Sequence, residues 1–116
     1  MNKDFVYINP HFKKGKSKTI FTVCAVSGFD RNELGLKRTY GWYTKLKDAY
    51  KDVIANRGDL WESSYDYIVI EEVKEGVWGM AIKEWWFKWN WQDSKKGFHP
   101  IRKPKETKGT INWSIG

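Results

Sequence analysis

The chain has 116 residues, of which 41% are hydrophobic and 17% aromatic, and its formal net charge is +7. This length predicts one domain spanning residues 1–116, and the single cysteine, Cys24, excludes an internal disulfide and fits a reducing compartment. The longest apolar run, 20–26, is too short to cross a bilayer, and the first residues lack the apolar core of a signal peptide. We therefore expect a soluble, cytoplasmic protein without a membrane partner.

The charge is concentrated at the two ends. Residues 1–18 carry a net charge of +4 and residues 95–116 a net charge of +5, which leaves −2 between them. Basic ends favour an anionic partner such as a nucleic acid, a nucleotide or another phosphate-bearing ligand. The alternative is that the charge only keeps the surface soluble.

Alternating and β-branched residues predict strands over 3–8, 19–26 and 36–42. An amphipathic helix is expected over about 44–57, because apolar residues follow Thr44, a suitable N-cap, at helical spacing. Gly58 is the expected stop beyond the last turn. Further strands are predicted over 65–74, 84–91, 98–101 and 110–115, with a turn or irregular edge over 77–82.

This order of elements predicts an α+β fold with a mainly antiparallel sheet of about five or six strands and one helix. With one helix, most neighbouring strands must be joined by turns, which makes the sheet antiparallel. The helix covers one face only. The other face carries aromatic residues and would be wet in a monomer, so we expect a homodimer or a higher homo-oligomer.

The aromatic strand has two different faces. Its even spacing directs Trp85, Phe87, Trp89 and Trp91 to one side of an extended chain. Trp86, Lys88 and Asn90 point to the other side, where a ligand could meet a ring, an ammonium and an amide.

The sequence does not favour an enzyme. His11 and His99 are the only histidines, and neither has a metal-ligand spacing or a cysteine pair near it, so we expect no metal and no cofactor. Nucleophile turns and phosphate-binding glycine loops are absent. Glu71 and Glu72 point to opposite faces of a strand and cannot share one substrate. The acids Glu71, Glu72, Glu75 and Glu84 are instead expected to pair with lysines on adjacent strands.

A binding function fits better. A nucleotide needs a flat ring for its base, which Trp61, Tyr65, Trp78 or Trp86 could supply. It also needs directed donors for its phosphates, and only four of the 21 basic residues are arginines, whose planar fork matches phosphate oxygens. Lys88, Asn90 and Arg102 are therefore candidate ligand residues, and Arg31 and Arg57 a second anion site. Asn90 could instead cap a strand end or a turn.

Two segments carry a resemblance to a known family. One runs from Arg38-Thr39-Tyr40-Gly41-Trp42-Tyr43-Thr44 into the helix, and the other from Tyr67-Ile68-Val69-Ile70-Glu71-Glu72-Val73 through Gly76-Val77-Trp78-Gly79 to Trp85-Trp86-Phe87-Lys88-Trp89-Asn90. Together they cover about half of the chain. They resemble the phage-encoded Thoeris anti-defence proteins of the first described type.

Those proteins are sponges that sequester the glycocyclic ADP-ribose signal of bacterial TIR-domain enzymes without degrading it, and some also hold cyclic oligonucleotides as hexamers. The resemblance implies a dimer or a trimer of dimers in the cytoplasm of an infected bacterium. It places an aromatic contact at Trp78 or Met80, an asparagine at Asn90 and an arginine at Arg102. The basic tail 98–108 is a candidate lid.

The favoured hypothesis is thus a non-enzymatic protein that sequesters a small cyclic nucleotide-type signal and blocks anti-phage immunity. A nucleic-acid-binding module is the second choice, because basic ends and aromatic residues also occur in single-strand binders. The third is a protein inhibitor that docks on a host enzyme, since interfaces are enriched in Trp, Tyr and Arg.

Overall fold

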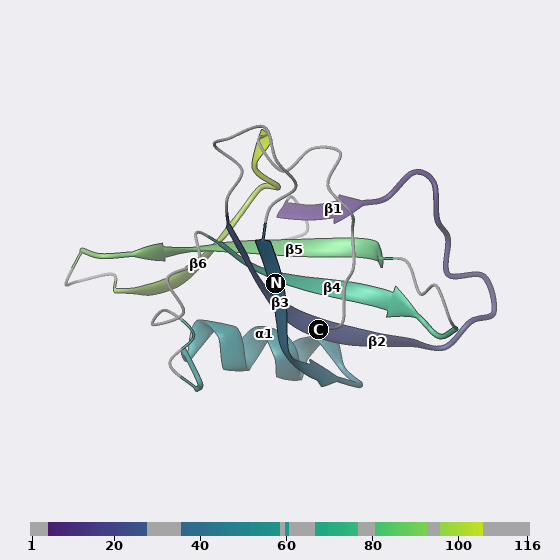
Figure 1. The fold of residues 1–116 in the computed structure, drawn as a ribbon, viewed down its shortest axis with the longest axis horizontal. Coiled ribbons are helices and arrows are strands. Elements are labelled where there is room, and N and C mark those ends of the chain that lie inside the picture. Colours follow the sequence, from purple (N-terminus) through teal and green to yellow (C-terminus); the bar gives the residue numbers. More distant parts are fainter. Residues whose placement is uncertain are drawn as a thin grey trace.

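The computed structural model of the chain describes residues 5–27, 36–58, 60, 67–76, 81–92 and 96–105. Figure 1 shows the strands and the helix that these residues form. In chain order they are β1 (Val6–Ile8), β2 (Thr19–Ser27), β3 (Leu36–Tyr43), α1 (Leu46–Ile54), β4 (Tyr67–Lys74), β5 (Ala81–Asn90) and β6 (Gly97–Ile101). The α+β class predicted from the sequence is confirmed.

The strands form one antiparallel sheet in the order β1-β5-β4-β2-β3, and β6 also pairs with β5. β1 lies opposite residues 83–85 of β5, and β6 lies opposite residues 86–90. Because β4 occupies the other edge of β5, the two short strands share one edge end to end. The chain that leaves β6 therefore passes beside β1.

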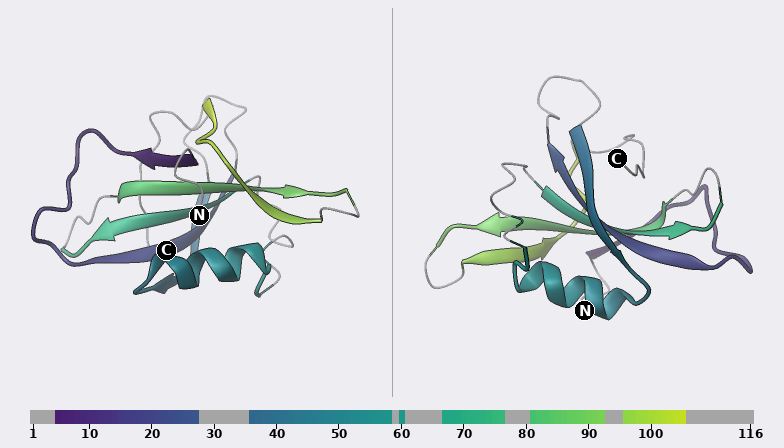
Figure 2. Two further views of the ribbon diagram at one scale, coloured as in Figure 1. Left: turned by 180° about the vertical axis from the view of Figure 1, so that it is seen from behind. Right: turned by 60° about the horizontal axis from the view of Figure 1, so that its bottom comes forward.

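The helix packs on one face of the sheet, as the two views of Figure 2 show. Ala49 and Val53 of α1 are fully buried against a core cluster that includes Ile70, Trp85 and Phe87. The period of two along β5 puts Trp85, Phe87 and Trp89 on one side of the strand, as predicted, and the structure shows that this is the helix face.

The helix is shorter than the predicted 44–57. β3 ends at Tyr43, and Lys45, with the extended backbone that N-cap residues adopt (φ −129°, ψ 131°), takes the N-cap position predicted for Thr44. At the other end Asn56 adopts a left-handed conformation (φ 51°). The Asn56 N–H donates to the Val53 carbonyl and the Arg57 N–H to that of Asp52, which is a Schellman motif. Asn56, rather than Gly58, therefore ends the helix.

The other face of the sheet is not the wet aromatic surface expected from the sequence. Cys24, Val69 and Trp86 are at most 4% exposed there and form a second buried cluster with Val26 and Tyr67. Cys24 packs as a small hydrophobe, as predicted. Because the rings on this face are buried within one chain, they give no reason to expect a dimer.

Several sequence predictions fall outside the described residues. They are the beginning of the strand predicted over 3–8, the first residues of the strand over 65–74, the segment 77–80 and the strand over 110–115. The predicted short strand over 98–101 is β6, which begins one residue earlier.

Candidate functional site

Lys88 and Asn90 lie near the end of β5 that pairs with β6. Lys88 is opposite His99, is exposed, and has its ammonium 5.8 Å from the centre of the Tyr67 ring. The Asn90 side-chain oxygen accepts a 2.9 Å hydrogen bond from the Gln92 N–H. Asn90 therefore holds the turn that follows the strand, which is one of the two roles expected for it. Within the described residues, its amide nitrogen makes no hydrogen bond.

Arg102 directly follows β6 and is exposed, with its guanidinium 5.9 Å from the centre of the Phe5 ring. In the β5–β6 register Asn90 lies opposite Gly97, five residues before Arg102. An extended chain of that length separates the two backbones by roughly 16 Å. Within one chain Asn90 and Arg102 therefore do not line the same small site.

Other predicted ligand residues lie outside the described part of the chain. They are Arg31, Trp61, Tyr65, Trp78 and Met80. Among the described rings, Trp86 is only 4% exposed and cannot stack on a base. Phe98, at the start of the candidate lid, is 5% exposed and packs 5.0 Å from Trp89, so it belongs to the core rather than to a lid.

Among the described residues, the accessible rings lie mainly on the edge strand β3. Trp42 is 64% exposed and Tyr40 is 41% exposed, and the Arg38 guanidinium lies 5.3 Å from the centre of the Tyr40 ring. Trp91, beyond the end of β5, is also 64% exposed and contacts Trp89 edge to face. These rings and cations are the described surface that best matches the chemistry of a nucleotide.

A recess of about 70 Å³ lies between β3 and the end of α1. Val23, Val53 and Leu60 form its apolar floor, Tyr40 and Tyr43 line its wall, and Asp52 and Arg57 stand at its rim.

The rim is held together by hydrogen bonds to Asp52. The Tyr43 hydroxyl donates to this carboxylate over 2.6 Å, and Arg57 Nε donates to it over 3.0 Å. Burial and the bond to Asp52 raise the pKa of Tyr43 to about 12. The bond from Tyr43, together with that from Arg57, lowers the pKa of Asp52. Because Asp52 offsets the charge of Arg57, the predicted anion site at Arg57 is weakened.

The comparisons with known proteins find no match. No protein-family model matches the chain, and neither a curated protein nor a solved structure does.

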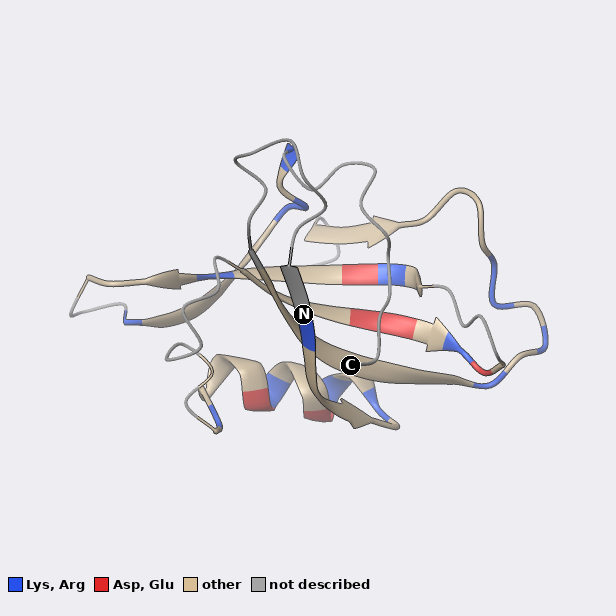
Figure 3. Cartoon of the chain, viewed as in Figure 1, with Lys and Arg blue, Asp and Glu red and all other residues tan. Residues whose placement is uncertain are grey.

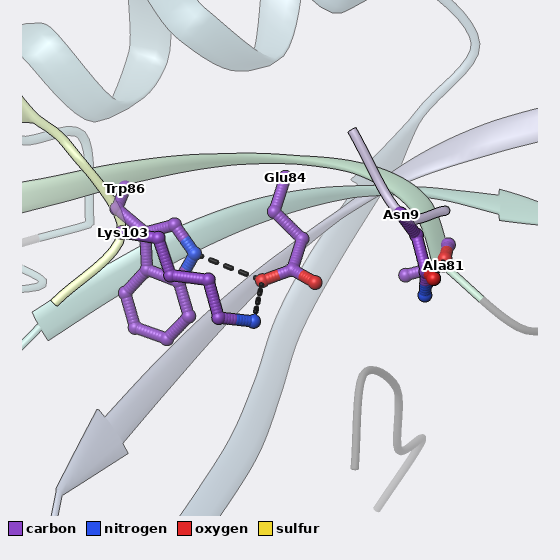
Figure 4. Close-up of polar contacts among 5 residues, drawn as sticks. All are labelled: Asn9, Ala81, Glu84, Trp86 and Lys103. Carbon is purple, nitrogen blue, oxygen red and sulfur yellow. Dashed lines mark hydrogen bonds and ion pairs between the residues drawn. The ribbon is translucent and has the colours of Figure 1, made fainter. Parts of the chain in front are cut away.

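A polar cluster that sequence reasoning missed lies on the face opposite the helix. Glu84 is 1% exposed, and one of its oxygens accepts a 2.9 Å hydrogen bond from Trp86 Nε1 and a 2.8 Å bond from the Lys103 ammonium, as Figure 4 shows. We call Tyr7, Glu84, Trp86 and Lys103 the Glu84 cluster. Glu84 does pair with a lysine, as expected, but the lysine follows β6 instead of lying on an adjacent strand.

Glu71 adds a second carboxylate beside this cluster. It lies directly opposite Glu84 in the β4–β5 register and is also 1% exposed, and Figure 3 shows the acidic residues of the two strands side by side. Glu71 and Glu72 do point to opposite faces, as predicted, but the pairing of Glu71 with Glu84 was not considered. The sequence contains a signal for the burial of Glu71, because the apolar run 67–70 just before it marks a strand buried on both faces.

Two absences hold for the described residues. They contain no group of three or more His, Cys, Asp or Glu side chains placed to bind a metal ion. In the same part of the chain, no helix has the length and hydrophobicity to cross a membrane.

Proposed function

We propose that this protein is a non-enzymatic binding protein that captures a small phosphorylated nucleotide-type ligand and releases it unaltered. The proposal extends to the ligand class implied by the sequence resemblance, a glycocyclic ADP-ribose signal, whose removal would block bacterial anti-phage immunity. Its site would use Lys88, Asn90 and Arg102, together with Trp78 or Met80.

The observation that best supports this proposal is the repeated pairing of cations with rings. Arg38 lies over Tyr40 and Arg102 over Phe5, at 5.3 and 5.9 Å from the ring centres, and Lys88 lies 5.8 Å from the centre of the buried Tyr67 ring. All three cations are exposed. A nucleotide presents a flat base and an anionic phosphate close together. Base stacking contributes roughly 1–3 kcal/mol per ring, and charged hydrogen bonds hold the phosphate.

The separation of Asn90 and Arg102 bears on the oligomeric state. A ligand that contacts both residues of one chain would have to span much of the roughly 16 Å between their backbones. In a homo-oligomer, Asn90 of one subunit and Arg102 of a second could instead face the same ligand. The proposal therefore includes a homodimer or a higher homo-oligomer with its site between subunits.

A capture experiment tests the release of an unaltered ligand. The purified protein is mixed with the product of a TIR-domain enzyme, separated from free ligand by filtration, and denatured by heat. Chromatography of the released small molecules should recover the intact signal in proportion to the protein. A cleaved product, or no retained ligand, would contradict capture without degradation.

A second candidate function is favoured by β3. Arg38, Tyr40 and Trp42 follow one another along one edge strand and are all exposed, which resembles the stacking surface of a single-strand nucleic-acid binder. Such a protein would bind oligonucleotides with an affinity that falls steeply with salt. Replacing Trp42 with Ala should then weaken oligonucleotide binding and leave capture of a small ligand unchanged.

A further inference from the structure

The ammonium of Lys103 is enclosed by groups that attract a cation. It lies 2.8 Å from a Glu84 oxygen, 4.4 Å from the centre of the Tyr7 ring and 5.6 Å from that of the Trp86 ring. The Lys103 side chain is only 11% exposed. Aromatic faces within about 6 Å of a cation attract it through the negative charge of the ring face, and desolvation strengthens the attraction.

We call the three residues around this ammonium, Tyr7, Glu84 and Trp86, the cage. The sheet positions them without help from Lys103. Tyr7 and Glu84 are direct partners in the β1–β5 register, and Trp86 lies two residues further along β5 on the same face. Trp86 Nε1 donates to Glu84 and thereby orients the carboxylate. The Trp86 ring is also packed edge to face against Tyr67, at 5.9 Å between centres.

Lys103, by contrast, comes from a segment outside the sheet. β6 ends at Ile101, and residues 102–105 run past β1 because β1 and β6 share one edge of β5. Figure 4 shows the Lys103 side chain reaching Glu84 beside the Trp86 ring. The walls of the cage and its cationic occupant thus belong to different parts of the fold.

We propose that Tyr7, Glu84 and Trp86 form a binding site for a primary alkylammonium group, and that Lys103 occupies this site in cis as a clasp that fastens residues 102–105 to β1 and β5. Glu71, directly opposite Glu84, places a second carboxylate on the same face and favours a cation there. The cage shares no residue with the proposed ligand site, although Arg102 of that site lies in the fastened segment, so this inference does not depend on the proposed function.

Chemical rescue tests the site directly. Lys103→Ala removes three carbons and the ammonium, which together match n-propylammonium. The melting temperature of this variant should rise saturably with n-propylammonium chloride and less with methylammonium. The neutral probe 1-propanol and equal concentrations of sodium chloride should have no such effect.

Matched variants complete the test. The wild type, in which Lys103 fills the site, and Lys105→Ala, which removes an exposed lysine, should show no rescue. Rescue should also be lost in Lys103→Ala/Glu84→Gln. If Lys103→Ala is unfolded in buffer, the same series is followed as recovery of the near-ultraviolet circular dichroism signal. An equal response to n-propylammonium and sodium chloride would overturn the proposal.

Acylation of the wild-type protein gives a second, independent measurement. An amine-selective reagent followed by mass spectrometry should modify Lys103 at least tenfold more slowly than Lys105. In Glu84→Gln, where the carboxylate is gone, the two rates should approach each other. Equal rates in the wild type would show that Lys103 does not occupy the cage.

Discussion

Glu71 and Glu84 stand directly opposite each other on neighbouring central strands, and each is only 1% exposed. Two buried carboxylates on one face of a sheet repel each other unless cations and donors balance them. Lys103 and Trp86 supply a cation and a donor to Glu84. The stability of this face therefore depends on a residue that lies beyond the last described strand.

Replacing Lys103 with Met should destabilise the protein by about 3–5 kcal/mol, because it leaves the Glu84 charge buried without its ammonium. The double variant Lys103→Met/Glu84→Leu should recover most of this lost stability, since two apolar side chains leave no buried charge without a partner. Urea unfolding of the three proteins measures both effects. Equal stability of the wild type and Lys103→Met would mean that the ion pair contributes nothing.

Tyr43 gives a prediction in alkaline solution. Burial and the hydrogen bond to Asp52 raise its pKa from 10.0 to about 12, so the folded state favours the neutral phenol. The resulting stability is fully present below pH 10 and is lost as the pH rises toward 12. The stability difference between wild type and Tyr43→Phe should therefore be constant below pH 10 and shrink above it.

Tyr40→Phe is the matched control for that experiment, because it removes a hydroxyl on the same strand and leaves the bond between Tyr43 and Asp52 in place. Its stability should follow the wild type between pH 10 and 12. A constant difference between wild type and Tyr43→Phe throughout this range would contradict the raised pKa.

At the end of α1, we expect a glycine variant to be more stable than an alanine variant, the reverse of their order inside a helix. Asn56 has a φ of 51°, where a Cβ is unfavourable, so Asn56→Gly should be about 1 kcal/mol more stable than Asn56→Ala. Both variants lose the Asn side chain, so the comparison isolates the backbone. At Lys51, inside the helix, Ala should instead be the more stable by about 1 kcal/mol. Thermal unfolding of the four variants measures the two differences.

Ligand capture should depend on Asn90 and Arg102. Arg102→Ala should weaken capture by about 1–3 kcal/mol through the loss of a charged partner. Asn90→Asp keeps an acceptor for the Gln92 N–H, and hence the turn, but removes the amide donor and adds a charge that repels phosphate. It should weaken capture without changing the melting temperature. Unchanged capture in both variants would place the site elsewhere on the chain.

The sequence predicted the fold well because its local signals agree. Alternation along β5 correctly placed Trp85 and Phe87 on the same side of the strand, and the single helix implied an antiparallel sheet. The predicted helix bounds were wrong at both ends: Lys45 rather than Thr44 is the N-cap, and the left-handed Asn56 ends the helix before Gly58.

The candidate site was less predictable, because it depends on strand pairing. Periodicity shows which face of its own strand Trp86 occupies, but not that Lys103 lies between it and Tyr7. It separates Glu71 from Glu72, but only the β4–β5 register brings Glu71 opposite Glu84. In the same way, the β5–β6 register separates Asn90 from Arg102, two residues that the resemblance assigns to one ligand.

The central claim, capture of a small phosphorylated ligand, is tested most directly by titration calorimetry with glycocyclic ADP-ribose at two salt concentrations, beside a single-stranded oligonucleotide of mixed sequence. We predict saturable heat from the cyclic ligand with little change between 50 and 200 mM salt, and weak oligonucleotide binding that largely disappears at the higher salt. Tight oligonucleotide binding without heat from the cyclic ligand would contradict the account.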